Sequence, residues 1–175
     1  MEKRMSPAKI RKLLEFIGGR LKQFVMDVAL EDTEEGPALT ITVASPFGDE
    51  EGISYTIMVE DTGEGLAMMQ IMMTVFYEVP EERFDDVDDL ITEINTRTTM
   101  GYFSLFEDAG LVLYNQSFLM DAGAATELAA ALLSRCMIIM EASVKENGAW
   151  IDRLLKGEET PEEILSAMKE RSESV

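Results

Sequence analysis

The sequence contains no histidine and a single cysteine, Cys136, among its 175 residues. Without histidine, the chain lacks the commonest general base and the commonest side-chain ligand of transition metals. One cysteine can form neither an internal disulfide nor a thiolate metal site, which is typical of a reducing compartment. Because Cys136 lies in the apolar run 136–140 and no histidine can activate it, we interpret it as a small buried hydrophobe.

The chain also lacks long hydrophobic runs and the common catalytic motifs. Its most apolar region, residues 128–140, is interrupted by Ser134 and Arg135, and the stretch after the basic N-terminus is broken by Glu15 and Gly18. Neither region is typical of a membrane span or a signal peptide. No glycine-rich phosphate loop, GxSxG motif or HExxH motif occurs in the sequence. We therefore expect a soluble, cytoplasmic protein that is not an enzyme and needs no cofactor.

Basic residues are scarce in the body of the chain. The net charge is −19, and residues 23–134 contain 23 acidic side chains but only two basic ones, Arg83 and Arg97. A body this negative repels phosphate backbones, so nucleic acid is not an expected partner. Residues 1–22 are the exception, with seven basic side chains and two acidic ones. We interpret this basic segment as neutralising the acidic body of the same molecule, with a docking role as the alternative.

The N-terminal region predicts a helix, followed by a segment with two readings. Ser6-Pro7 starts the helix, because serine is a good N-cap and proline is favoured at the first helical position. Residues 21–30 fit either more of that helix or the first strand of a hairpin, and the turn-like segment 31–36 makes us choose the hairpin. The helical stripe would be Phe24, Val25 and Val28, and the strand face would be Phe24, Met26, Val28 and Leu30.

The rest of the chain predicts an α+β fold. Period-two alternation predicts strands over residues 39–43, 53–59, 66–79, 102–107 and 111–120. A helix should follow Pro80, a long helix should run from Ala122 to about Leu155 with Asp121 as its cap, and a short helix should cover 160–169. The prediction is an antiparallel sheet of about five to six strands, packed by an N-terminal helix, a middle helix and a long C-terminal helix. We divide the chain into a domain over residues 1–157 and a short helical extension over 158–175.

The predicted strand over residues 66–79 has two unequal faces. One face is wholly apolar and suits a core, whereas the other is mixed and too apolar for a fully solvated surface. Methionine, with 13 copies in the chain, is flexible and suits surfaces that accept varied apolar partners. We therefore predict that the mixed face contacts a partner. Its candidate residues are Met68, Gln70, Met72, Thr74 and Phe76.

The long C-terminal helix supplies a second candidate surface. Residues 128–140 are apolar nearly all round, which is typical of a helix that is buried on every side. In a chain of this size one side can face the sheet, so we expect the other side to meet a second molecule. The candidate residues on this outer side are Leu132, Cys136 and Ile139.

Clustered carboxylates leave a second functional class open. Residues 85–89 carry four aspartates, but the cluster lacks the third ligand, the central glycine and the terminal glutamate of an EF-hand loop. We interpret it as a solvated helix face, and we predict no metal site. A carboxylate-based sensor of small molecules or divalent cations remains the alternative function.

The segment from Leu90 to Gly123 resembles the YbjN family, whose members share the fold of type III secretion chaperones. The likeness rests on the helix ending in Ile94-Asn95, on Gly101-Tyr102-Phe103 before an aromatic strand, and on the acidic turn into an apolar strand. The long helix after Asp121 also fits. The resemblance implies a compact α+β sandwich, commonly dimeric, with helices packed on a sheet.

The same resemblance bears on function. Chaperones of this fold hold an extended effector segment against hydrophobic grooves, whereas YbjN-like proteins are described as regulators without an established enzymatic activity. We therefore expect a non-enzymatic, chaperone-like or regulatory homodimer that binds a protein client or regulatory partner. The family offers no catalytic residues to transfer.

Overall fold

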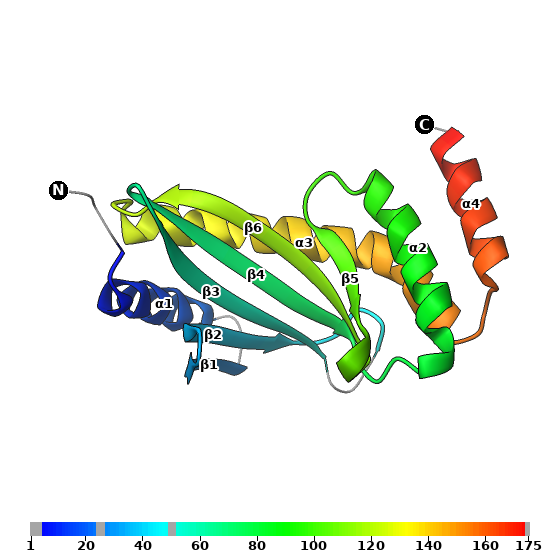
Figure 1. Ribbon diagram of the computed structural model, residues 1–175, viewed down its shortest axis with the longest axis horizontal. Coiled ribbons are helices and arrows are strands. Elements are labelled where there is room, and N and C mark those ends of the chain that lie inside the picture. The colour runs from blue at the N-terminus through cyan, green and yellow to red at the C-terminus, as the bar shows by residue number, and fades with distance from the viewer. Residues whose placement is uncertain (1–4, 24–26, 49–51, 174–175) are drawn as a thin grey trace.

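The computed structural model describes residues 5–23, 27–48 and 52–173 (Figure 1). The elements, in chain order, are α1 (Pro7–Leu21), β1 (Asp27–Thr33), β2 (Gly36–Val43), β3 (Ile53–Gly63), β4 (Leu66–Phe76), the 3-10 turn η1 (Glu81–Arg83), α2 (Phe84–Arg97), β5 (Tyr102–Phe106), the 3-10 turn η2 (Glu107–Ala109), β6 (Leu111–Asp121), α3 (Thr126–Leu155) and α4 (Pro161–Glu173). The predicted α+β class, with an antiparallel sheet packed by an N-terminal and a long C-terminal helix, is confirmed.

The described strands form one six-stranded antiparallel sheet in the order β1-β2-β3-β4-β6-β5. The pairs β1–β2, β2–β3, β3–β4 and β5–β6 join strands that follow each other in sequence, whereas β4 pairs with β6 rather than with β5. β1 and β5 form the two edges of the sheet. The β1–β2 hairpin confirms the strand prediction for residues 27–30, with Val28 opposite Ile41 and Leu30 opposite Leu39. The predicted strand positions Phe24 and Met26, and Val25 of the alternative helix, lie outside the described residues.

The helices lie on one side of the sheet. α3 runs along it behind β4 and β6, α1 packs against β1 and β2, and α2 packs against β5 (Figure 1). α3 buries one stripe against the sheet, with a spacing of three and four residues that is typical of an amphipathic helix. Its buried residues include Ala129, Ala130, Leu133, Met137, Met140 and Val144. The opposite side of α3 is exposed, so in one copy of the chain the helix is buried on one side only.

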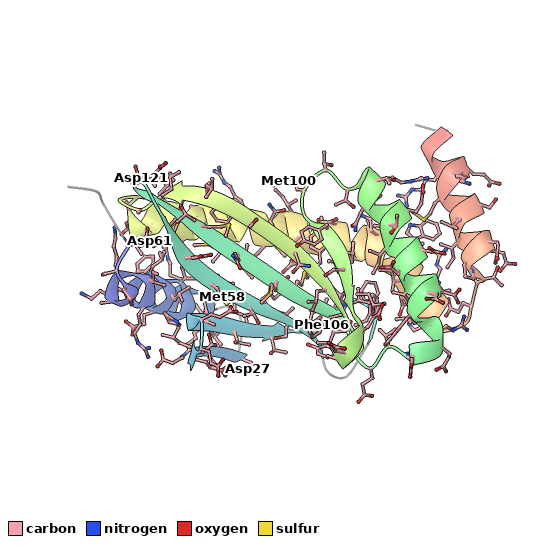
Figure 2. The ribbon with its side chains drawn as sticks, viewed as in Figure 1. Asp27, Met58, Asp61, Met100, Phe106 and Asp121 are labelled. Atoms are coloured by element: carbon pink, nitrogen blue, oxygen red, sulfur yellow. The ribbon has the colours of Figure 1, made fainter. Side chains whose placement is uncertain are left out.

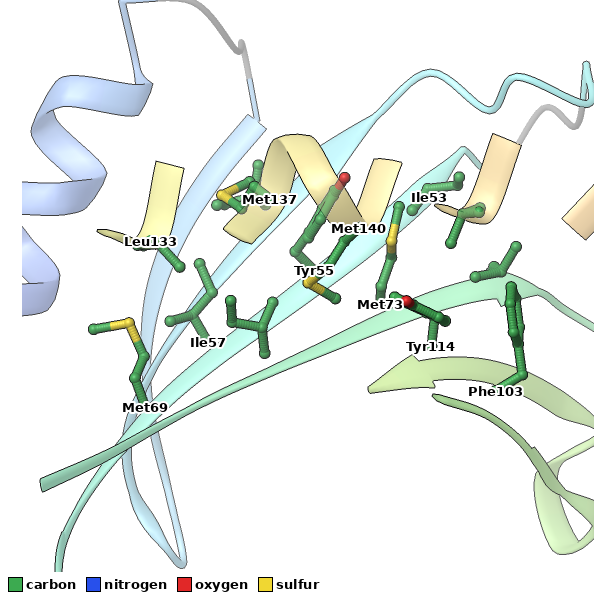
Figure 3. Close-up of a cluster of buried hydrophobic side chains, with 14 of the residues drawn as sticks. Ile53, Tyr55, Ile57, Met69, Met73, Phe103, Tyr114, Leu133, Met137 and Met140 are labelled. Atoms are coloured by element: carbon green, nitrogen blue, oxygen red, sulfur yellow. The ribbon is translucent and has the colours of Figure 1, made fainter. Parts of the chain in front are cut away.

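The core lies between the sheet and α3 (Figure 3). Tyr55 and Ile57 of β3, Met69 and Met73 of β4, and Tyr114 of β6 point toward Leu133, Met137 and Met140 of α3. Each of the five strand side chains is at most 1% exposed. Full burial of a large apolar side chain contributes about 1.5–3 kcal/mol, so this layer fixes which face of the sheet turns inward. Met69 and Met73 are therefore core residues, while the side chains between them turn outward.

Several predicted element boundaries are wrong, and the errors at the end of β4 and at the start of α3 each have a local cause. β4 ends at Phe76 rather than Val79, because the register with β6 shifts between Thr74 and Phe76 and Glu78 has a positive φ of 51°. α3 begins at Thr126 after an extended Ala125. Asp121 is the last residue of β6, and its Oδ1 accepts a hydrogen bond from the Gly123 N–H at 2.5 Å. It therefore closes a turn instead of capping the helix.

An arginine of the basic N-terminal helix forms an ion pair with a carboxylate at the acidic edge of the sheet. Arg11 Nη1 lies 2.5 Å from Asp32 Oδ1 on β1, and Arg11 Nε lies 3.4 Å from Glu15 Oε1. Lys9 donates from Nζ to the carbonyl oxygen of Ala122, next to β6. These contacts support the interpretation that the basic segment neutralises part of the same molecule.

α4 packs on the main body through two apolar side chains. Ile164 is fully buried and Met168 is 4% exposed, and the helix contacts α2 and α3. Gly157, with φ of 68°, ends α3 in the left-handed conformation that favours glycine and turns the chain toward α4. The division of the chain after residue 157 stays a prediction, but the extension contributes to the same hydrophobic core.

Candidate functional site

The side of the sheet turned away from α3 is not covered by any element among the described residues (Figure 1). Neighbouring strands bring matching positions together there. Met72 lies opposite Thr56 of β3 and Asn115 of β6, and Asn115 lies opposite Tyr102 of β5. We call this side the open face, and the positions on it alternate with the buried core positions along each strand.

Four of the five predicted sheet contact residues lie on the open face. Met68, Gln70, Met72 and Thr74 are half-buried and occupy alternate positions of β4. The prediction is wrong for Phe76, which is 5% exposed. The register shift after Thr74 returns Phe76 to the inner side, opposite Val112, where its ring lies 5.1 Å from that of Phe47. A β-bulge changes the face of the residues that follow it, and alternation alone does not reveal it.

The open face also contains apolar residues that the sequence analysis missed. Met58 of β3 and Leu113 of β6 are half-buried, while Leu119, Tyr102 and Phe106 are 60%, 54% and 51% exposed. Met58 on β3 and Phe106 on β5 show how far this apolar area extends across the sheet (Figure 2). The sequence pattern could have predicted these positions, because each residue alternates along its strand with a core position such as Ile57, Val112 or Phe103.

A shallow hollow of about 270 Å³ lies near the middle of the open face. Its lining includes Met68, Gln70, Met72, Tyr102, Asn115 and Ser117. Asn115 Nδ2 donates a hydrogen bond to Ser104 Oγ at 2.9 Å, which fixes the amide between β6 and β5. The hollow therefore combines flexible methionine side chains with amide and hydroxyl groups that can accept or donate hydrogen bonds.

The charges on the strands have one sign. The six described strands carry six acidic side chains and no lysine or arginine. Asp27, Glu31, Glu60 and Asp121 share the pairing rows of the open face, at its edges and strand ends. The open face is thus an apolar centre with an acidic surround, which attracts positive side chains and repels negative ones.

The outer side of α3 is a second apolar surface, which we call the outer stripe. Leu128, Ile138 and Ile139 are 55%, 66% and 42% exposed. The predicted contact residues Leu132 and Cys136 lie on the same helix and are half-buried, and burial raises the pKa of the Cys136 thiol. The open face and the outer stripe lie on opposite sides of the molecule, since α3 packs against the inner face of the sheet. They are therefore two separate surfaces.

The aspartates of residues 85–89 do not converge. Asp85, Asp88 and Asp89 are exposed around α2, and Asp86 Oδ2 lies 3.3 Å from Arg83 Nη1. Within residues 5–23, 27–48 and 52–173, no three His, Cys, Asp or Glu side chains come together in a way that could hold a metal ion. Nor is any helix in these ranges both long and apolar enough to cross a membrane.

The arrangement defines a class of protein: an α+β domain with one face of its sheet packed by helices and the other open. The model of the YbjN family, described as "Putative bacterial sensory transduction regulator", matches residues 21–145. The chain therefore belongs to the YbjN family. The crystal structure of YbjN from E. coli, described as "a putative transcription regulator", is similar at a TM-score of 0.48 and 14% identity, over 82% of this chain and 92% of that chain. No curated protein matches the sequence.

Proposed function

We propose that this protein is a non-enzymatic cytoplasmic regulator that holds an extended polypeptide segment on its open face, in a chaperone-like manner. The observation that carries the proposal is the uncovered sheet face with Met58, Met68 and Met72 at its centre. Apolar patches that stay uncovered within a domain mark interaction sites, and methionine adapts its shape to different apolar side chains.

The charge around the open face selects the chemistry of the partner. Because the strands carry acidic side chains and no basic ones, a segment that alternates apolar and basic residues is complementary. Its apolar side chains would rest on the methionines, and its lysines or arginines would reach Asp27, Glu31 or Glu60. A second copy of the chain is a poor occupant of this face, since it would bring two acidic surrounds together.

We assign the proposed homodimer contact to the outer stripe instead. Leu128, Leu132 and Ile139 recur at intervals of three to four residues or their multiples, as in a helix–helix contact. α3 carries four acidic and three basic side chains, so a contact along this helix brings together less like charge than a contact between two open faces. The dimer would leave the open face of each copy free for its partner.

Three labelled peptides of 12 residues test the partner chemistry by fluorescence anisotropy. One alternates valine and lysine, one alternates serine and lysine, and one alternates valine and glutamate. We expect the valine–lysine peptide to bind at least about tenfold more tightly than either of the others, which is a difference of about 1.4 kcal/mol. Equal binding of the serine–lysine peptide would reduce the interaction to charge alone and contradict the proposal.

A double variant locates the binding. Met68→Ser with Met72→Ser should weaken the valine–lysine peptide about tenfold or more and leave the circular dichroism spectrum unchanged, because both side chains are half-buried. Ile138→Ser, on the outer stripe, is the matched control and should bind the peptide like the parent protein. If the double variant also binds like the parent, the peptide lies elsewhere.

A further inference from the structure

A hollow of about 540 Å³ lies between the end of α2, the second half of α3 and α4. This volume falls in the range of small-molecule sites, which is roughly 300–1,000 Å³. The loop from α2 to β5 forms one rim, and Met100 on that loop is labelled in Figure 2. The hollow is separate from the open face, because it lies among helices at the end of the molecule where α4 packs (Figure 1).

Part of the lining of the hollow is apolar. This part comprises Met100, Ile139, Trp150 and Met168. Met100 and Ile139 are each 42% exposed, whereas Met168 is 4% exposed and anchors α4. An indole ring next to flexible aliphatic side chains suits a flat or extended apolar body.

The lining also contains two arginines, Arg97 and Arg171, in a protein with a net charge of −19. Arg97 is held in place: its Nη2 and Nε lie 2.6 and 3.1 Å from Glu93 Oε1, and its Nη1 donates to the Met168 carbonyl oxygen at 2.6 Å. A guanidinium group has five N–H donors, so Arg97 can bind an anion and keep these contacts. It is therefore oriented before any ligand arrives.

The second arginine is more easily released. Arg171 Nη2 lies 2.9 Å from Glu146 Oε1, with the two side chains 61% and 59% exposed. Exposed ion pairs of this kind are weak, so an anionic head can replace Glu146 on Arg171. Because Glu146 stays close by, a head with one negative charge is better tolerated than one with two. A planar carboxylate also matches the fork of a guanidinium.

We propose that this hollow binds a small amphipathic anion, a carboxylate carried on an apolar chain or ring. The carboxylate lies between Arg97 and Arg171, and the apolar body lies against Trp150 and Met168. Asn147 and Ser143, joined by a hydrogen bond of 3.3 Å from Nδ2 to Oγ, also line the hollow. Such a ligand would tie α4 to α2 and α3. The proposal does not depend on the open face.

The test uses octanoate and 1-octanol, which share an alkyl chain and differ in charge. Trp150 is the only tryptophan in the sequence, so its fluorescence reports on the hollow that it lines. Calorimetry run in parallel detects binding that leaves the fluorescence unchanged. We expect saturable binding of octanoate that is at least about tenfold tighter than binding of octanol. Equal affinities, or no saturable binding of octanoate in either measurement, would overturn the proposal.

Variants of three arginines assign the contact. Arg171→Gln should reduce the preference for octanoate over octanol at least about threefold, and Arg97→Gln should do the same with a lower melting temperature, because it also loses the contact to Met168. Arg153→Gln is the matched control. Its guanidinium carbon lies 4.9 Å from the Trp150 ring centroid and its Nη1 lies 3.2 Å from Glu159, but it does not line the hollow. An unchanged preference in Arg171→Gln, or an equal loss in Arg153→Gln, would contradict the assignment.

Discussion

Asn95 and Phe103 exchange two hydrogen bonds. Asn95 Nδ2 donates to the Phe103 carbonyl oxygen at 2.9 Å, and the Phe103 N–H donates to Asn95 Oδ1 at 2.8 Å. Phe103 belongs to the edge strand β5, where outward backbone groups have no neighbouring strand to pair with. The asparagine at the end of α2 thus acts as a short substitute for a strand and fixes the helix to the sheet edge.

Asn95→Ala removes both of these bonds. We expect the free energy of unfolding to fall by about 1–3 kcal/mol, because two partly buried backbone groups lose their partners. Urea denaturation measures the change, and hydrogen exchange at the Phe103 amide should become faster. Thr92→Ala, at an exposed position one turn earlier in α2, is the control and should stay close to the parent. If Asn95→Ala were as stable as the parent protein, water would replace the hydrogen bonds of the amide with no loss of stability.

Gly101 stands where a side chain has no room. Its φ is +75°, and an added Cβ would lie 2.7 Å from the Asn115 carbonyl oxygen and 2.8 Å from Tyr114 Cζ. We expect Gly101→Ala to destabilise the fold by about 2 kcal/mol or more, from backbone strain and the close contacts together. Gly19→Ala is the opposite case, since an added Cβ there meets nothing within 4 Å. In the helix α1 it should be neutral or stabilise by up to about 1 kcal/mol. Thermal melts of both variants check the contrast.

Tyr55 makes the free energy of unfolding depend on pH in the alkaline range. Its Oη donates to Glu141 Oε1 at 3.1 Å. Burial, followed by the charge and the hydrogen bond of Glu141, raises the pKa of Tyr55 above its ordinary value of 10.0. Below pH 10 the hydroxyl is protonated in both states, so its full contribution is present. Above pH 10 the unfolded chain releases a proton that the folded chain keeps, so stability falls as the pH rises.

Tyr55→Phe isolates this effect. At pH 7 the variant should be about 1 kcal/mol less stable than the parent, because the hydrogen bond to Glu141 is lost. The difference should shrink as the pH rises above 10, since the variant has no hydroxyl to ionise at this position. Urea denaturation at pH 7 and pH 10.5 measures the difference in stability between the two proteins at each pH. Lysines that titrate in this range affect both proteins equally and do not change the difference. A constant difference would argue against a raised pKa.

The proposed dimer can be tested at Ile138, which is 66% exposed. Ile138→Asp should cost the single copy little stability, yet it would place a charge in the apolar contact and weaken association at least about a hundredfold, or roughly 2.7 kcal/mol. Sedimentation equilibrium measures the association. Met72→Ser on the open face is the control and should leave it unchanged. A parent protein that is monomeric at micromolar concentration would contradict the dimer itself.

The sequence predicted the strands and the sheet well, because each strand buries one face and the alternation of side chains records it. It could not place Phe76, since one inserted residue after Thr74 changes the inward and outward positions without altering the composition. The start of α3 was misplaced for a similar reason, because aspartate suits a turn as well as a helix cap. The sequence around Asp121 is compatible with a role in a turn and with a role as a helix cap.

The candidate sites were predictable only in part. Met68 and Met72 stood out because they lie on one strand with a recognisable alternation. The hollow among the helices was not visible in the sequence, since Arg97, Trp150 and Arg171 come from three helices that only folding brings together. Tyr102 and Met58 alternate with the core positions Phe103 and Ile57, so their place on the open face could also have been predicted.

The open face and the outer stripe lie on opposite sides of the molecule, with the sheet and α3 packed together between them. Association through the stripe would therefore produce a bivalent particle, with two methionine-rich faces directed away from each other. A partner with two suitable segments, joined by a linker long enough to pass around the dimer, would gain avidity from the second contact. Two separate partners could instead be brought together without competing for the same surface.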